Sequence, residues 1–130
     1  MLLVKTTIGP SPIHGIGVFA AEAIPKGTVM WRLERGFDLE LTQEQVDRLS
    51  PPAREKTLHY AYKDPRTDLY VLCMDDARFY NYSEAANSAK DPAEPERDIA
   101  LRDIRPGEEI TYDYGSFDTD FEREPFVRRA

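Results

Sequence analysis

The chain has 130 residues, 41% of them hydrophobic, and a formal net charge of −7. This length gives one domain with a single core and leaves no room for a second catalytic domain. The acidic excess argues against direct nucleic-acid binding, because phosphate contacts need clustered Lys and Arg, and it favours a basic partner. The alternative interpretation is that the charge only keeps the protein soluble.

The single cysteine, Cys73, excludes an internal disulfide and a cysteine-rich zinc site, and we expect it to be a buried, inert thiol. Residues 1–8 are too few for the apolar region of a signal peptide and are interrupted by Lys5. No apolar run approaches the roughly 18 residues of a membrane-spanning helix. We therefore expect a soluble, cytoplasmic protein with no membrane partner.

Short segments rich in β-branched and aromatic residues, separated by turns, predict a mostly β fold. The predicted strands are 2–8, 16–21, 28–33, 69–74, 98–104 and 109–114. Two turns, 23–28 and 103–109, share a Pro and Gly pattern that leads the chain into a strand. The polar stretch 84–97 is expected to form a loop.

Between the third and fourth strands, residues 40–61 are predicted to form a helical insert. Thr42 and Gln45 have the spacing of a capping box, which indicates a helix start. Ser50 then places Pro51 at the first position of a second short helix that runs to about Tyr60.

Three stretches carry candidate functional residues, and the first contains Gly15, Ile16 and Gly17. Two glycines around one residue let the backbone approach a ligand closely or adopt a positive φ. The stretch lacks the third glycine and the following helix of a dinucleotide-binding fold. Taken alone, it is more typical of a plain β-turn.

The second stretch is 77–88, where Asn81 and Ser83 follow a strand-like run and could fix a turn or orient a ligand. The third is 107–115, "GEEITYDYG", in which strand alternation places the Tyr112 and Tyr114 rings on one face. A buried phenol needs a hydrogen-bond partner. Two of them on one face therefore indicate either a structural network or a lined pocket.

In their order and spacing, the three stretches together resemble the SET-domain family of protein-lysine N-methyltransferases, over about Lys5 to Phe117. The resemblance implies a single SET domain over 1–130, with a tail of about 116–130 that takes the place of a post-SET module. It implies a β-clip fold of several small sheets, in which the C-terminal strand region is threaded under a loop as a pseudoknot. That threading would bring the second and third stretches together.

The resemblance also implies the cofactor, S-adenosylmethionine, which leaves as S-adenosylhomocysteine, and a basic protein or peptide as substrate. No metal is implied. The residues that match the family's cofactor site are His14, Gly15, Ile16, Gly17, Asn81, Tyr82, Tyr114 and Phe117.

By the same resemblance, Tyr114 matches the catalytic tyrosine, and Tyr112 matches a position where the family has Phe or Tyr. A phenol at Tyr112 would leave less room for a methylated amine, so we expect a bias toward monomethylation. Tyr60 and Tyr62 are expected to share a strand face and to line the substrate channel together with Tyr112.

The chain departs from the family pattern at Tyr82 and Glu84, which stand where the family has His and Cys, whereas Asn87 matches the motif's second asparagine. Two other functions therefore stay open: a SET-fold interaction module without catalysis, and a methyltransferase that acts on a small amine.

The sequence does not identify the substrate protein, and it leaves open whether the protein forms a homodimer. The acidic residues of the tail, Asp118, Asp120, Glu122 and Glu124, are expected either to steer a basic peptide or to be plain solvated surface.

Overall fold

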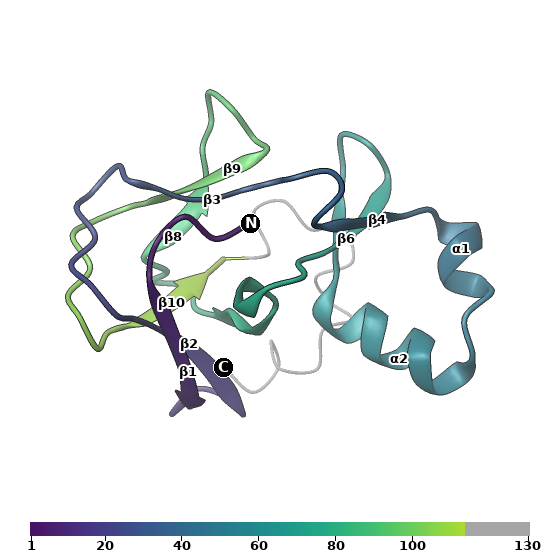
Figure 1. The fold of residues 1–130 in the computed structure, drawn as a ribbon, viewed down its shortest axis with the longest axis horizontal. Coiled ribbons are helices and arrows are strands. Elements are labelled where there is room, and N and C mark those ends of the chain that lie inside the picture. Colours follow the sequence, from purple (N-terminus) through teal and green to yellow (C-terminus); the bar gives the residue numbers. More distant parts are fainter. Residues whose placement is uncertain (114–130) are drawn as a thin grey trace.

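The computed structural model describes residues 1–113, and this part of the protein is mostly β, as the sequence predicts (Figure 1). The strands are β1 (Thr6–Pro10), β2 (Ile16–Ala20), β3 (Val29–Arg32), β4 (Leu39–Leu41), β5 (Tyr62–Asp64), β6 (Leu69–Leu72), β7 (Asn81–Tyr82), β8 (Ser88–Lys90), β9 (Arg97–Ala100) and β10 (Glu109–Tyr112). The helices are α1 (Gln43–Asp47), α2 (Pro51–Tyr60) and a 3₁₀ turn, η1 (Asp76–Phe79).

The larger sheet has the strand order β1-β2-β10-β8-β9-β3, and β7 also pairs with β10. Strand β10 runs antiparallel to β2 but parallel to β7 and β8. Its register places Tyr112 opposite both Tyr82 and Ser88. This parallel pairing brings the second and third motif stretches together, which is the arrangement that the expected threading requires.

Side-chain hydrogen bonds hold β10 in this register. The Asn87 amide donates to the Glu109 carbonyl at 2.8 Å, and its oxygen accepts from the Thr111 N–H at 2.9 Å. The Ser88 hydroxyl donates to the Thr111 carbonyl at 2.7 Å. The prediction of a continuous loop over 84–97 is therefore wrong, because β8 lies inside that stretch as a short polar strand between β9 and β10.

The smaller sheet, β4-β6-β5, lies beside α1 and α2, on the other side of the molecule from β9 and β3 (Figure 1). The capping box is confirmed: the Thr42 hydroxyl accepts from the Gln45 N–H at 3.1 Å, and the Gln45 side chain accepts from the Thr42 N–H at 2.8 Å. Strand β4 was not predicted. Tyr60 and Tyr62 do not share a strand face, because Tyr60 ends α2 and Tyr62 begins β5.

The main core lies on the larger sheet and includes Val18, Met30, Trp31 and Ile110. The two predicted turns of the chain, 23–28 and 103–109, are joined by a pair of backbone hydrogen bonds between Ile24 and Ile104, at 2.9 and 2.8 Å. Cys73 is buried as expected, and burial raises the pKa of its thiol far above the ordinary value, so it stays protonated and inert. No helix among the described residues is long and apolar enough to cross a membrane.

Candidate active site

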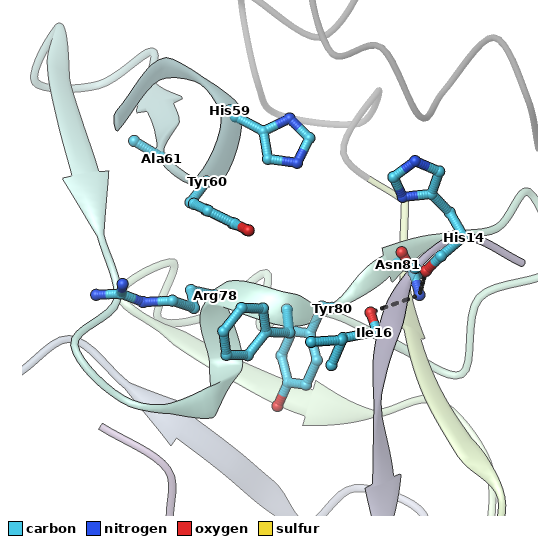
Figure 2. A pocket seen from close by; sticks show the side chains of 10 residues that line it. His14, Ile16, His59, Tyr60, Ala61, Arg78, Tyr80 and Asn81 are labelled. Carbon is cyan, nitrogen blue, oxygen red and sulfur yellow. Dashed lines mark hydrogen bonds between the residues drawn. The ribbon is translucent and has the colours of Figure 1, made fainter. Parts of the chain in front are cut away.

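A pocket of about 260 Å³ lies between the end of α2, the start of β2 and the segment that connects η1 to β7. In Figure 2, His59 and Tyr60 stand on one side of it, and His14 and Asn81 on the other. We call it the first pocket. The described residues that line it are His14, Gly15, Ile16, His59, Tyr60, Ala61, Arg78, Phe79, Tyr80 and Asn81.

One side of the first pocket is a row of aromatic rings. The ring of His59 lies 4.7 Å, edge-on, from that of Tyr60, which in turn meets Phe79 edge-on at 5.5 Å. The His14 ring, on the other side of the pocket, lies 6.5 Å from that of His59. Burial lowers the pKa of His59 below its ordinary value, and the nearby charges of His14 and Lys56 lower it further. The surroundings of His59 therefore favour its neutral form. This wall offers flat apolar surface with a polar edge.

The opposite wall is held by Asn81, which is 4% exposed. Its amide group donates to the carbonyls of His14 at 3.0 Å and Ile16 at 3.2 Å, and to the Glu109 carboxylate at 2.9 Å. Gly15, between those two carbonyls, has a φ of +47°, a conformation that favours glycine. Asn81 therefore fixes the backbone of the glycine stretch from β7.

Gly17 has a packing role. A Cβ there would lie 2.5 Å from Oε2 of Glu109. The Ser11 hydroxyl donates to both oxygens of this carboxylate, at 2.8 Å to Oε1 and 2.9 Å to Oε2, and the Asn81 amide donates to Oε2. The glycine thus makes room for a carboxylate that is held in place from two sides.

We expect Gly17→Ala to lower the free energy of unfolding by about 1 to 3 kcal/mol, because the added methyl group must displace the anchored Glu109 side chain. Thermal or urea denaturation measures the change. Gly36→Ala serves as the comparison, since nothing lies within 4 Å of its added Cβ and only its φ of +92° opposes the substitution. A Gly17 variant as stable as the wild type would contradict this packing role.

A second pocket, of about 20 Å³, adjoins the first and shares Tyr60, Arg78 and Tyr80 with it. This volume holds about one water-sized group, so it accommodates the end of a narrow side chain rather than a bulky ring. The other described residues that line it are Trp31, Tyr62, Cys73, Ala77, Lys90, Asp98 and Tyr112.

A charged pair is built into the second pocket. The buried Tyr112 hydroxyl donates to the Asp98 carboxylate at 2.7 Å, and the Lys90 ammonium lies 3.4 Å from the same carboxylate oxygen. Lys90 also donates to the Tyr62 hydroxyl at 3.1 Å and lies over the rings of Trp31 and Tyr62. Burial raises the pKa of Asp98, an effect that Lys90 and the Tyr112 hydrogen bond oppose.

The structure brings together most of the residues singled out from the sequence. His14, Gly15, Ile16 and Asn81 line the first pocket, and Tyr62 and Tyr112 line the second, while Tyr60 lines both. Two expected cofactor contacts, Gly17 and Tyr82, are not among the lining residues. The remaining expected site residues, Tyr114 and Phe117, and the acidic tail lie outside the described residues.

Sequence reasoning missed several lining residues. Arg78, Phe79 and Tyr80 directly precede Asn81, so the quoted stretch 77–88 already contained the signal for them. His59 carried no signal, because nothing local shows that the end of α2 faces the glycine stretch. Lys90 and Asp98 carried none either, because they meet only through the pairing of β8 with β9.

Within residues 1–113, no group of three or more His, Cys, Asp or Glu side chains is arranged to hold a metal ion. The polar side chains of the two pockets are instead the Asn81 amide, phenols, two imidazoles, the Cys73 thiol, the Arg78 guanidinium and the Lys90–Asp98 pair. These groups suit the binding of an organic molecule.

Comparisons with known proteins identify the family of the chain. The SET domain family model matches residues 15–115. A Plasmodium falciparum protein described as a candidate histone methyltransferase shares the fold, with a TM-score of 0.60 at 22% identity over 88% of this chain and 96% of that chain. No curated protein sequence matches significantly.

A second solved structure, the Neurospora SET domain protein DIM-5, a histone lysine methyltransferase, has a TM-score of 0.60 and 26% identity. The similarity covers 87% of this chain, which spans about half (53%) of the DIM-5 chain. The family match covers most of the sequence and includes Gly15, Ile16 and Gly17 of the first motif stretch and the whole of the other two. The chain therefore belongs to the SET domain family.

Proposed function

We propose that the protein is a protein-lysine N-methyltransferase that uses S-adenosylmethionine. The observation that carries the proposal is the junction of the two pockets at Tyr60, Arg78 and Tyr80. A wide pocket with aromatic walls meets a narrow pocket lined by phenols. In the proposed reaction the cofactor would occupy the wide pocket and the lysine the narrow one, so that the two reacting atoms meet at the junction.

The first pocket fits S-adenosylmethionine by the chemistry of its lining. The rings of Tyr60 and Phe79 offer apolar surface for a purine, and the Arg78 guanidinium offers a partner for a carboxylate. His14, Gly15 and Ile16 bring backbone groups to the edge of the pocket. These residues would hold the cofactor, which supplies a methyl group on a sulfonium when bound.

The second pocket fits the end of a lysine side chain. Free lysine has a pKa of about 10.4, and only its neutral amine is a nucleophile. The buried rings of Tyr62 and Tyr112 exclude water, which disfavours the ammonium form. In this proposal Tyr114, outside the described residues, orients the amine, and the substrate is a basic protein or peptide.

Tyr112 is proposed to limit the number of methyl groups that the amine receives. Its ring stacks on Tyr80 with a centroid distance of 6.2 Å, and its hydroxyl is fixed by Asp98. A phenol oxygen held at the wall of so small a pocket leaves little room for an amine that already carries a methyl group.

We expect Tyr112→Phe to shift the product from monomethyl-lysine toward dimethyl- and trimethyl-lysine, because removing the hydroxyl frees space beside the amine. Mass spectrometry of a methylated basic peptide measures the distribution. Tyr62→Phe is the matched control, since it also removes a phenol from the second pocket but leaves the Tyr112 hydroxyl in place. A wild type that already yields mainly trimethyl-lysine would refute the proposed limit.

The proposed activity is tested by incubating the protein with labelled S-adenosylmethionine and basic proteins, with Tyr114→Phe as the control. We expect label on lysine with the wild type and a large loss with the variant. Binding of S-adenosylhomocysteine, measured by calorimetry, separates an enzyme from an interaction module, because the module need not bind it. Label on free amines but not on protein would favour the small-amine alternative.

A further inference from the structure

The Lys90–Asp98 pair is an unusual feature for the wall of a pocket that receives an amine. The two residues face each other across β8 and β9, and their side chains are mostly buried, at 16% and 8% exposed. Burying two charges is costly, and replacing such a pair with apolar residues often leaves a protein equally stable. Stability alone therefore gives no reason for the pair.

The surroundings keep both charges in place. The Lys90 ammonium lies 5.0 Å from the ring centroid of Trp31 and 4.6 Å from that of Tyr62, so two aromatic faces stabilise the cation. The Asp98 carboxylate accepts from the Tyr112 hydroxyl at 2.7 Å. Because that hydroxyl uses its hydrogen in the bond to Asp98, the Tyr112 oxygen can only accept a hydrogen bond from a group in the pocket.

The other titratable groups of the second pocket keep one protonation state, so Lys90 and Asp98 are the groups whose substitution changes its charge most directly. Burial raises the pKa of Tyr62 and of Cys73, so both stay neutral over the working range of pH. The ionisable side chains that line the pocket with the pair are Tyr60, Tyr62, Cys73, Arg78, Tyr80 and Tyr112. More distant charges also act on the pKa values of Tyr62, Cys73 and Asp98; they are Asp38, Asp64, Asp75 and the N-terminal ammonium.

We infer that Lys90 and Asp98 are positioning residues that set the protonation of the acceptor amine, with Asp98 also holding Tyr112. The inference rests on the proposed function. A cation beside the pocket lowers the pKa of an incoming lysine, and an anion raises it. The pair itself adds no net charge to the second pocket, so Asp98 offsets the repulsion of Lys90 toward the incoming amine and Lys90 prevents Asp98 from holding that amine as ammonium.

The sign of the effect of removing Asp98 follows directly. Asp98→Asn keeps an oxygen that accepts from Tyr112 but removes the negative charge that lies 3.4 Å from the Lys90 ammonium. The pKa of the bound substrate amine then falls, and the rise of the transfer rate with pH moves to lower pH. We expect a shift of about half a pH unit or more.

Two double variants separate charge from structure. Asp98→Asn with Lys90→Met removes both charges, so the pH profile is expected to return toward that of the wild type. Asp98→Asn with Lys90→Arg keeps a cation that does not lose its proton, so the shift to lower pH is expected to persist. Asp91→Asn is the control outside the pocket, because it removes the negative charge of the 2.7 Å ion pair with Arg97 near the same pair of strands and should leave the profile unchanged.

The experiment records the rate of transfer to a lysine peptide from pH 6.5 to 10, with circular dichroism of each variant as a check of folding. An unchanged profile in Asp98→Asn, or the same shift in the charge-free double variant, overturns the inference while the proposed function stands. A wild type that transfers no methyl group overturns both.

Discussion

Asn87→Ala is expected to lower the free energy of unfolding by about 3 to 5 kcal/mol, the largest stability effect of any substitution considered. The residue is 1% exposed, and its amide bonds to the Glu109 carbonyl and the Thr111 N–H. Alanine leaves both backbone groups of β10 without these partners. Since a domain is typically stable by only about 5 to 15 kcal/mol, this loss is a large part of the total.

Urea denaturation followed by circular dichroism measures this loss. Ser83→Ala is the matched control from the same stretch, because the Ser83 hydroxyl accepts only an exposed hydrogen bond from the Ala85 N–H at 3.1 Å among the described interactions, and we expect it to cost less than about 1 kcal/mol. If the two variants lose similar stability, Asn87 does not anchor β10.

Asn81→Ala is expected to weaken the binding of S-adenosylhomocysteine at least tenfold, which corresponds to about 1.4 kcal/mol. The amide is the link between β7 and the carbonyls of His14 and Ile16, so its loss releases the backbone that forms one wall of the first pocket. Titration calorimetry gives the dissociation constant.

Asn81→Asp sharpens this test, because Asp has nearly the same shape but no amide donor. It would also face the Glu109 carboxylate, which now accepts from Asn81 at 2.9 Å. We therefore expect Asp to be at least as harmful as Ala. Binding that is retained in the Asp variant would show that shape, rather than hydrogen-bond donation, matters at this position.

The sequence predicted those parts of the fold that depend on local chemistry. The capping box of Thr42 and Gln45 and the proline start of α2 are read from neighbouring residues, and both are present. Strand β8 was missed, because Ser88, Ala89 and Lys90 have little strand propensity and become a strand only by pairing with β9 and β10. Tertiary pairing overrode the local signal.

The difference between local signals and tertiary packing also explains which site residues could be predicted. Ile16 and Asn81 were found because they belong to motifs within the family match, and His14 because it directly precedes the glycine stretch. His59 and the Lys90–Asp98 pair were not found, because their place in the pockets depends on how distant segments pack. Gly17 was assigned to cofactor contact, whereas its lack of a side chain is needed by Glu109.

The central position of β10 has a consequence for how the protein is made. Val18 pairs with Ile110, so the two halves of the larger sheet are joined by the last strand of the described chain. Contacts between residues so far apart form late and slowly. During synthesis, the facing edges of β2 and β8 stay open until β10 has left the ribosome, and the nascent chain is most exposed to aggregation in that interval.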